Sequence, residues 1–402
     1  MSQKKLLHVI SSMNPKSGGP CQGIRNYNSV KTNKYVREVV CLDNPNEEFL
    51  KQGEMPKHAL GEANNIWGYS SKLLPWLVKN LPKYDVVIIN GLWQYTAYAT
   101  WKAVRILKKQ QKASGLPTSI PKIFVMPHGM LDPYFQKAAH RKLKAIRNWF
   151  YWKLIESKVI KDADGLLFTC EEELLLARTT FKPYLPKKEY NVGYGIQAPP
   201  LFTPAMTTAF QEKCAGLNGH PYFLFLSRIE RKKGVDLLIK AYLKTYKDAD
   251  TTTVHPIPKL VIAGPGLDTA YGKEMIKLAA HHKNIYFPGM VNGDAKWGAF
   301  YGCEAFILAS HQENFGIVIP EALACHKPVL ISDKINIWRE VQKGGGGFVT
   351  TDTLEGTLSL FTQWKQLSML EKEQMAKNAY TVYSEYFMIE RAHKNLINVI
   401  FQ

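Results

Sequence analysis

The sequence predicts an α/β protein made of two doubly wound, parallel-sheet domains. Its 402 residues are long for one core and suggest two domains of roughly 200 residues each. Short apolar, β-branched runs recur along the chain, and stretches with helical period lie between many of them. Strand alternating with helix is typical of parallel sheets that carry helices on both faces.

The expected strands are continuous apolar runs, as in strands that are covered on both faces. In chain order they are Leu6–Ile10, Val39–Leu42, Asp85–Asn90, Lys122–Met126, Gly165–Thr169, Tyr222–Ser227, Lys259–Ala263, Asn284–Phe287, Ala305–Ala309 and Pro328–Ser332. The expected helices include Trp67–Lys79, Tyr95–Lys109, Leu143–Lys158, Val235–Lys244 and Asp294–Tyr301.

A stretch punctuated by glycine and proline, residues 194–200, has no apolar periodicity and predicts a domain boundary. The pattern of strands restarts at Tyr222. We therefore expect an N-terminal domain over 1–200 and a C-terminal domain over 201–379. Ligands of such sheets bind at the carboxyl ends of the strands, so two facing domains would hold a ligand in the cleft between them.

Composition disfavours several classes of protein. No uninterrupted apolar stretch reaches the roughly 18 residues of a membrane-spanning helix. The apolar run near the N-terminus is too short for a signal peptide and reads better as a first buried strand. The six cysteines are scattered without a CxxC pair, which argues against a structural zinc site and a disulfide framework. We expect reduced thiols in a cytosolic protein.

The positive charge is concentrated in the N-terminal half. The chain carries a net charge of +18; residues 1–200 have 30 Lys+Arg and 15 Asp+Glu, whereas residues 201–402 have 22 and 19. Within 101–150 there are 11 basic residues and one acidic residue, Asp132. Such an asymmetry implies an anionic partner, either nucleic acid or an anionic membrane surface. A solubilising excess of charge would give the same totals.

The first expected strand is followed by Gly18-Gly19-Pro20, which we do not expect in ordinary helix or strand. A double glycine there lets the backbone approach a bulky group such as a phosphate. A simple turn is the alternative.

A basic loop, residues 228–234, joins the expected strand at Tyr222–Ser227 to the expected helix that starts at Val235. Cations beside the positive end of a helix favour an anion. Arg228 could grip phosphate oxygens bidentately, and Lys233 could add a point charge. The alternative is a solvated run of charges.

Two further loops follow expected strands. His128 and Gly129 come after Lys122–Met126, in a position that would face the cleft, although a lone histidine is usually structural. Gly264 and Gly266 follow the strand that ends at Ala263.

The segment HQENFGIVIPEAL, residues 311–323, contains Glu313 and Glu321 with seven residues between them. A helix is expected to begin near Gly316, with Pro320 in its first turn, where proline is tolerated. Glu313 would then lie in the loop and Glu321 on the helix. The peptide NH groups around 314–317 would point at the ligand.

These residues resemble those of the retaining glycosyltransferases of family 4, which have the GT-B architecture of two facing Rossmann-like domains. The similarity rests on Arg228 with Lys233 and on Glu313-x7-Glu321 ahead of Ala-Leu-Ala. In the C-terminal half it includes FLSRIERKKGVDLLIKAY, VIAGPG, FPG, AFILASHQENFGIVIPEALACHKPVLIS and a Gly344–Gly347 run. In the N-terminal half, GGP, VVIINGLW and VMPHGMLDP resemble members that build bacterial surface polysaccharides.

The resemblance implies a role for each matching residue. Arg228 and Lys233 would bind the diphosphate of a nucleotide-sugar donor, Glu321 the ribose, and Glu313 the hydroxyls of the donor sugar. His128 would contact the sugar. The backbone would contribute through Gly19 beside Gly18, through Gly264 and Gly266, and through the amides of Asn314, Phe315, Gly316 and Ile317. The last helix, over about 380–402, would cross back onto the first domain.

The chemistry implied by the resemblance is electrostatic. Fixed cations and amides stabilise the departing nucleoside diphosphate. No cofactor and no divalent metal is expected, and no DxD motif occurs in a suitable loop. Retention of configuration would follow from front-face attack, with a donor phosphate oxygen taking the acceptor proton. Double displacement with Glu313 as nucleophile is the alternative.

We expect the basic half to bind the acceptor, a saccharide or lipid-linked saccharide of cell-surface polysaccharide synthesis. Residues 135–155 mix cations with aromatic side chains, which suits the surface of an anionic bilayer on the cytoplasmic side. A helix with its aromatics in the core is the alternative. Other functions remain open: a GT-B nucleotide-sugar epimerase or hydrolase, or a basic nucleic-acid-binding protein. The sequence has no nucleic-acid-recognition motif that would favour the last. A GT-B phosphorylase is disfavoured, because it would normally need a pyridoxal phosphate lysine and a much longer chain.

Overall fold

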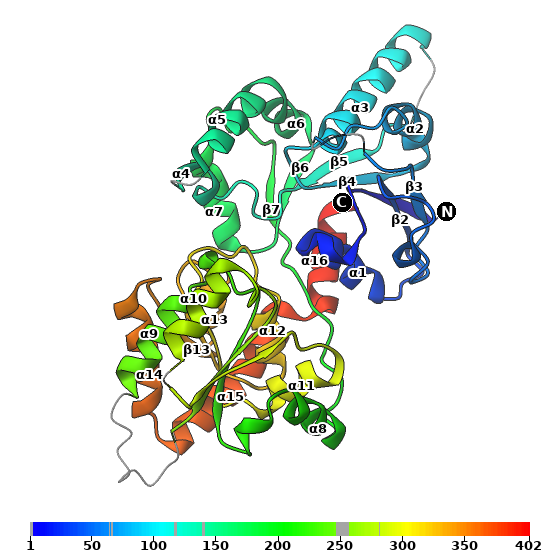
Figure 1. The fold of residues 1–402 in the computed structure, drawn as a ribbon. Helices are drawn as coiled ribbons and strands as arrows, with labels where there is room; N and C mark the ends of the chain where they lie inside the picture. Colours follow the sequence, from blue (N-terminus) through cyan, green and yellow to red (C-terminus); the bar gives the residue numbers. More distant parts are fainter. Residues whose placement is uncertain are drawn as a thin grey trace. The chain divides into compact units, whose positions relative to one another are not determined.

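Each half of the chain forms its own parallel sheet with helices on both faces (Figure 1). The computed structural model describes residues 3–63, 65, 67–115, 119–138, 141–246, 257–280 and 282–402. The chain divides into unit 1, residues 1–195 and 389–402, and unit 2, residues 196–388. Two Rossmann-like, parallel-sheet domains are therefore confirmed as the fold class.

Unit 1 contains a seven-stranded sheet in the order β3-β2-β1-β4-β5-β6-β7. Its strands are β1 Lys4–Val9, β2 Tyr35–Cys41, β3 Lys57–Ala59, β4 Val86–Asn90, β5 Lys122–Met126, β6 Gly165–Phe168 and β7 Glu189–Asn191. Its helices are α1 Gly19–Ser29, α2 Leu73–Asn80, α3 Tyr95–Ser114, α4 Tyr134–Lys137, α5 Lys142–Tyr151, α6 Ser157–Asp162, α7 Glu171–Thr180 and α16 Ile389–Ile400.

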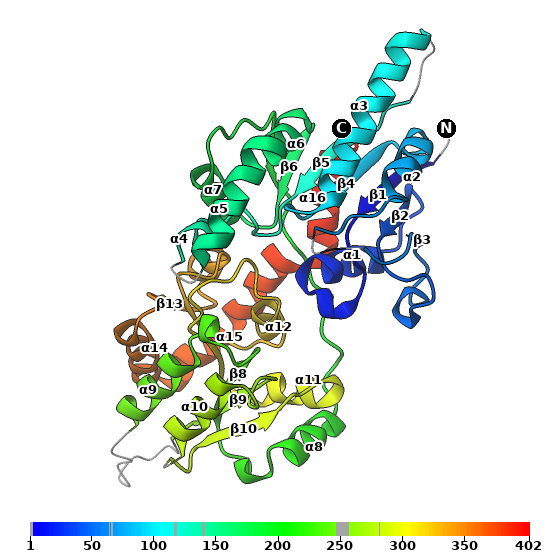
Figure 2. The same cartoon turned by 45° about the horizontal axis from the view of Figure 1, so that its top comes forward.

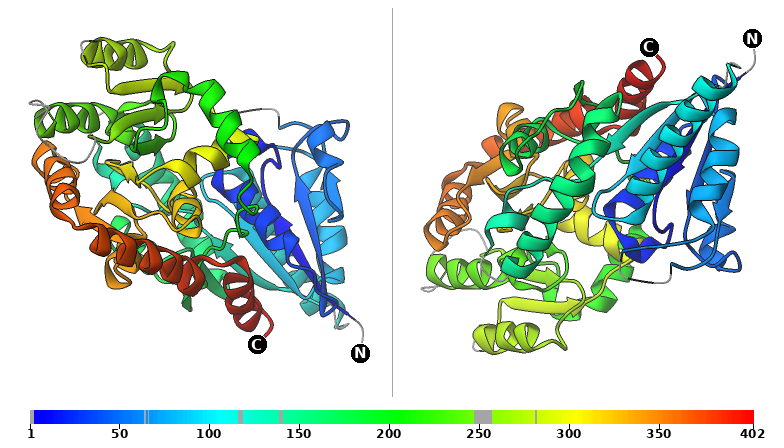
Figure 3. Two further views of the ribbon diagram at one scale, coloured as in Figure 1. Left: turned by 90° about the horizontal axis from the view of Figure 1, so that it is seen from below. Right: turned by 90° about the horizontal axis from the view of Figure 1, so that it is seen from above.

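Alternate residues of the unit 1 strands point to opposite faces of the sheet. One face, with Val87, Ile89 and Val125, packs under α2, α3, α6 and α7. The other face, with Val86 and Ile88, packs under α1 and α16. Figure 2 shows α16, in red, beside the blue α1, although the two helices are far apart in sequence. Figure 3 shows the two ends of the chain on the same side of unit 1.

Unit 2 contains a six-stranded sheet in the order β10-β9-β8-β11-β12-β13. Its strands are β8 Tyr222–Leu226, β9 Lys259–Ala263, β10 Ile285–Gly289, β11 Ala305–Leu308, β12 Val329–Ser332 and β13 Gly347–Thr350. Its helices are α8 Pro204–Lys213, α9 Val235–Thr245, α10 Ala270–Ala279, α11 Gly293–Gly302, α12 Val318–Ala324, α13 Trp338–Lys343, α14 Leu354–Gln366 and α15 Met369–Val382.

Strand order reverses once in each sheet, between β1 and β4 in unit 1 and between β8 and β11 in unit 2. Chain connections leave these neighbouring strands on opposite sides, so a crevice forms at their carboxyl ends, where ligands of doubly wound sheets bind. The fold therefore marks one such point, here called the switch point, in each unit.

The ten expected strands all form, with ends shifted by a few residues, and β3, β7 and β13 were not predicted. The expected helix Trp67–Lys79 was wrong at its start, because Gly68 takes a φ of 77° and α2 begins only at Leu73. The expected helix Leu143–Lys158 is interrupted by a π-helical turn, Trp152–Glu156. Trp152 and Glu156, the first and last residues of this turn, are both buried.

The expectation that Gly18-Gly19-Pro20 could not enter a helix was wrong for Gly19 and Pro20. Helix α1 begins at Gly19, with Pro20 in its first turn, where the missing amide hydrogen costs nothing. Gly18 precedes the helix with a φ of 84°. All six cysteines are buried and unpaired. Within the described residues, no helix combines the length and apolarity that crossing a bilayer requires.

Candidate active site

At the switch point of unit 2, the loops that follow β8 and β11 are joined by an ion pair. The Lys233 ammonium contacts the Glu313 carboxylate, and their side chains are only 8% and 20% exposed. Gly234 allows this close packing: its φ is 65°, and a Cβ there would lie 2.1 Å from the carbonyl oxygen of Ala309. Two residues that were singled out from different loops thus meet at the predicted edge of the sheet.

The neighbouring cations differ in how freely they can move. Arg228 is 68% exposed and pairs with Glu230 at 3.1 Å, so it can leave that partner at little cost. Burial lowers the pKa of Lys232, while Glu313 acts in the opposite direction. The backbone carbonyl of Lys232 accepts the amide hydrogen of His311 at 2.8 Å. Among the described residues, the ion-pair partner of Arg228 is Glu230 and that of Glu313 is Lys233, so no ion pair joins Arg228 to Glu313.

The loop after β11 is fixed on both sides of Glu313. The Glu313 amide donates to the Lys334 carbonyl at 2.9 Å, and its carbonyl accepts from the Asn336 amide at 3.0 Å. The Asn336 side chain also donates to Asn314 Oδ1 at 3.3 Å. Phe315 is buried against the ring of Phe387. The loop backbone is therefore held before any ligand binds.

Gly316 turns the chain into α12 with a φ of 68°. A Cβ at this position would lie 3.1 Å from Glu313 Cγ and from Ile319 Cδ1. Within the described residues, the amides of Gly316 and Ile317 have no hydrogen-bond partner and remain available. Pro320 lies in the first turn of α12, as predicted, although the helix starts at Val318.

Glu321 points to a different cation. Its Oε1 accepts from Lys296 Nζ at 2.6 Å, and this lysine comes from α11. Its Oε2 is buried without a hydrogen-bond partner. Burial raises the pKa of Glu321, and the contact with Lys296 partly opposes that shift. An oxygen in this state is an acceptor for a hydroxyl that arrives with a ligand.

Sequence reasoning missed Lys296. It lies 25 residues before Glu321, and only the packing of α11 near α12 brings the two together. The local pattern around Lys296 has no feature that could have indicated this contact.

Gly264 and Gly266 have a packing reason within the protein. A Cβ at Gly264, whose φ is 141°, would lie 1.9 Å from the Ser227 carbonyl oxygen. A Cβ at Gly266, with a φ of 110°, would lie 2.8 Å from that of Ile229. Both glycines let the loop after β9 lie against the loop that carries Arg228. Contact of these glycines with a ligand stays a prediction.

At the switch point of unit 1, His128 belongs to a hydrogen-bonded chain. Asn90, the last residue of β4, donates from Nδ2 to His8 Nδ1 at 3.3 Å. Asn90 Oδ1 lies 3.2 Å from His128 Nε2, which donates in this orientation. His8 and Asn90 were not predicted, because buried polar residues inside apolar strands have no distinctive spacing.

His8 and His128, the two histidines that Asn90 connects, are both neutral at pH 7. Burial lowers the pKa of His128 to about 4. Burial, followed by the charges of Arg37 and His128, lowers that of His8 to about 3. His128 is half-buried with a φ of 52°, and the Gly129 amide is held by Glu173 Oε1 at 2.5 Å. A neutral imidazole fixed in this way can accept or donate a hydrogen bond but carries no charge.

Gly18 and Gly19 lie beside open space: a Cβ on either would meet no heavy atom within 4 Å. The Gly19 carbonyl accepts from the Tyr194 hydroxyl at 3.0 Å. No group of three or more potential metal-ligating side chains occurs in the described part of the chain.

Parts of this sequence are similar to those of known proteins. Residues 209–381 match the family model described as glycosyl transferases group 1. The chain is 34% identical over 110 residues to an uncharacterized glycosyltransferase of Methanocaldococcus jannaschii, covering 27% of this chain and 26% of that protein. It is 25% identical over 222 residues to an alpha-monoglucosyldiacylglycerol synthase of Acholeplasma laidlawii, covering 50% and 53%. The chain thus spans between a quarter and about half of these relatives.

Solved structures resemble the whole chain. A crystal structure of HepE from Anabaena, in complex with UDP and glucose, aligns with a TM-score of 0.69 at 17% identity, covering 99% of this chain and 100% of that one. A sucrose-phosphate synthase from Thermosynechococcus elongatus aligns with a TM-score of 0.67 at 16% identity, covering 99% and 98%. At these identities the likeness shows the fold, which is of the GT-B class.

Lowering the pH is expected to destabilise the protein through His128. Its folded-state pKa of about 4 lies below the unfolded value of 6.5, so the unfolded state takes up protons first. The contribution of neutral His128 to the free energy of unfolding is fully present above pH 6.5 and is lost as the pH falls toward 4. The contribution is at most about 3 kcal/mol, since one pKa unit corresponds to about 1.36 kcal/mol.

His128→Asn should reduce this pH dependence in urea unfolding, because asparagine does not titrate. Asparagine also tolerates the left-handed backbone of this position, so the variant should still fold. His220→Asn, at an exposed histidine, is the control and should follow the wild type. Equal slopes for His128→Asn and wild type between pH 6.5 and 4.5 would contradict the assignment.

Proposed function

Because residues 209–381 match the family model of group 1 glycosyl transferases, we propose that this chain is a retaining, metal-independent family 4 enzyme that transfers a sugar from a nucleotide-diphosphate sugar. The observation that supports this most is the Lys233–Glu313 pair at the switch point of unit 2, inside the matched segment. A UDP-sugar is the first donor to test, because the HepE structures hold UDP, glucose and UDP-glucose.

The ion pair suggests how the donor is received. The diphosphate carries more negative charge than one carboxylate, so it competes with Glu313 for the Lys233 ammonium. Arg228, which is exposed and weakly paired, swings onto the same phosphates. Glu313, once released from Lys233, accepts hydrogen bonds from hydroxyls of the donor sugar. Glu321 Oε2, which lacks a partner, accepts from the ribose.

The reaction breaks the bond between the anomeric carbon and the phosphate oxygen, and the nucleoside diphosphate leaves with the electron pair. Arg228, Lys233 and the amides of 314–317 stabilise that developing charge. The acceptor oxygen bonds to the same face of the anomeric carbon, and its proton passes to a donor phosphate oxygen. The chain then supplies no general base and no nucleophile.

The acceptor is proposed to be a saccharide or lipid-linked saccharide of cell-surface polysaccharide synthesis, bound by the basic unit 1. His128, held neutral by burial, would exchange a hydrogen bond with a saccharide hydroxyl. Gly18 and Gly19 leave room for a ligand beside the first turn of α1.

Helix α5 supports a peripheral location on an anionic bilayer. Four large apolar side chains of α5 and one of the following π turn are 44–84% exposed: Leu143, Ile146, Trp149, Phe150 and Leu154. Exposed cations lie among them: Lys142, Lys144, Arg147 and Lys153. Trp152 instead is buried, so part of the expected aromatic cluster belongs to the core. Residues 139 and 140 of the basic segment lie outside the described residues.

Removing the exposed cation Arg228 is expected to cost most of the activity. Arg228→Ala should lower turnover of the preferred donor by about 10²–10³-fold, the typical cost of losing one group that stabilises transition-state charge. The measurement is turnover across a panel of UDP-, GDP- and ADP-sugars with the purified protein. Arg231→Ala is the matched control, since Arg231 lies in the same loop and pairs outward with Glu274. Wild-type rates in Arg228→Ala for every donor would contradict the phosphate role.

Glu313→Gln distinguishes the two routes to retention. A hydrogen-bonding role predicts a loss of about 10²-fold at most, because the amide keeps an acceptor oxygen. A nucleophile would lose nearly all activity and would leave a covalent glycosyl-enzyme in the wild type. Rapid quench of the wild type followed by intact-protein mass spectrometry looks for that adduct, and its presence would refute front-face attack.

Liposome flotation tests the membrane surface. The wild type should float with vesicles that contain anionic lipid and be released by salt. Replacing Ile146 and Phe150 by serine should reduce the floating fraction severalfold. Replacing Leu201 and Leu370 by serine should not reduce it, although these two side chains of unit 2 are more exposed than Ile146 and Phe150. Flotation that ignores lipid charge and salt, or that survives the α5 changes, would exclude this surface.

A further inference from the structure

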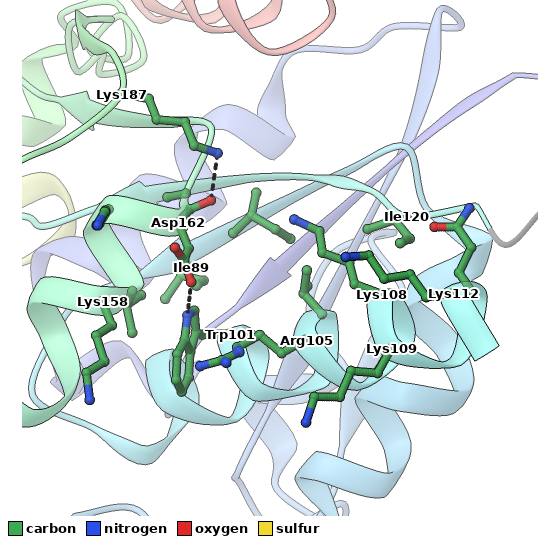
Figure 4. A pocket seen from close by; sticks show the side chains of 16 residues that line it. Ile89, Trp101, Arg105, Lys108, Lys109, Lys112, Ile120, Lys158, Asp162 and Lys187 are labelled. Atoms are coloured by element: carbon green, nitrogen blue, oxygen red, sulfur yellow. Dashed lines mark hydrogen bonds between the residues drawn. The ribbon is translucent and has the colours of Figure 1, made fainter.

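A second basic feature of unit 1 lies away from its switch point. An open groove of about 760 Å³ is bounded by α3, α6 and the start of β5 (Figure 4). Helix α3 starts after the carboxyl end of β4 and leads back toward the amino end of β5, so its last turns lie at the opposite edge from His128. Nothing in the proposed transfer of a sugar uses this edge.

Cations line the groove from several elements. Helix α3 contributes Arg105, Lys108, Lys109 and Lys112, at successive spacings of three, one and three residues. Such spacings place all four on one side of the helix, where like charges repel and destabilise the helix. The four cations on one side of α3 therefore lower the stability of the helix.

The opposite wall repeats the pattern. Helix α6 contributes Lys158 and Lys161, and Lys187 follows from the segment before β7. Lys187 is satisfied, with Nζ 2.9 Å from the Asp162 carbonyl oxygen and 3.3 Å from Asp164 Oδ1. The carboxylate of Asp162 is engaged by Trp101 Nε1 at 2.8 Å (Figure 4). Acidic groups of the groove are thus already in use.

Five of the lysines have no acidic partner among the described residues: Lys108, Lys109, Lys112, Lys158 and Lys161. Seven cations and one carboxylate line the groove, which gives it a net charge of +6. The carboxyl ends of α3 and α6 are close by, and each offsets about half a positive charge. The partial negative charges of the two helix ends therefore offset about one of the six excess positive charges. The remaining positive charges of the groove have no such compensation.

The shape of the groove narrows the class of ligand. Its volume lies within the roughly 300–1,000 Å³ of small-molecule sites, and a concave surface does not match a flat bilayer. The ring of Trp101 is covered by the Arg105 guanidinium, 4.8 Å from its centroid, so it offers no open platform for a nucleobase. Lysines act as point charges for phosphate and impose no planar geometry.

We propose that this groove between α3 and α6 is a binding site for a small oligophosphate, a ligand with several linked phosphate groups. Binding relieves the repulsion within α3 and between its cations and those of α6. The site is separate from the one that carries Arg228 and does not depend on the proposed sugar transfer.

The test is calorimetric titration of the full chain with inorganic tripolyphosphate, with orthophosphate as the low-charge comparison. Tripolyphosphate should bind at least about tenfold more tightly, and the affinity should fall as salt is raised, because exposed charges are screened. The triple variant Lys108→Ala, Lys109→Ala, Lys112→Ala should lose about tenfold or more in affinity. The corresponding lysine-to-arginine triple variant should retain it.

Two controls separate the groove from bulk charge and from the donor site. The triple variant Lys343→Ala, Lys365→Ala, Lys377→Ala removes the same charge from exposed positions of unit 2 and should bind as the wild type does. Arg228→Ala should leave groove binding intact, so loss of donor binding and loss of groove binding are distinguishable.

Equal affinity in the wild type and the α3 triple variant would overturn the proposal, as would an equal loss in the unit 2 control. An RNA oligonucleotide or anionic vesicles that bind more tightly than tripolyphosphate, and lose affinity in the α3 triple variant, would also overturn it.

Discussion

The contact between Lys233 and Glu313 is the interaction on which the candidate site depends. It connects the loop after β8 with the loop after β11, which are neighbours only because strand order reverses between those two strands. A nearly buried ion pair is costly to leave half-made, so each charge fixes the other until a better partner arrives. The backbone hydrogen bonds of Glu313 to the 334–336 segment extend that order to α13. The site is thus organised around an ion pair in which a polyanionic ligand can replace Glu313 as the partner of Lys233.

The sequence was informative wherever burial dictated the pattern. Strands β4, β5, β8 and β9 are continuous apolar runs buried on both faces, and their positions were predicted to within a residue. Strands β3 and β7, with the sequences KHA and EYN, are short, half-exposed edge strands. Their existence depends on pairing with a neighbour and leaves no apolar period to detect.

The same division applies to the site. Residues that follow the ends of buried strands, such as Arg228 and His128, are at positions that the strand pattern locates. Contacts between elements far apart in sequence could not be predicted, as Lys296 with Glu321 and Asn90 with His8 show. Gly264 was predicted to contact the donor, and the structure adds a reason for glycine there that the sequence could not indicate: a Cβ would lie 1.9 Å from the carbonyl oxygen of Ser227. The sequence therefore predicted which loops carry the candidate site, whereas the contacts between those loops depend on tertiary packing.

The membership of α16 in unit 1 has a consequence for synthesis of the protein on the ribosome. One face of the first sheet, with Leu6, Val86 and Ile88, is covered by residues of the last helix, including Leu396 and Ile400. A nascent chain has therefore made every strand of unit 1, and all of unit 2, before the helix that completes the first core exists. Apolar strands that wait for a late partner expose aggregation-prone surface during that interval. Synthesis order thus favours completion of the C-terminal unit before the N-terminal one.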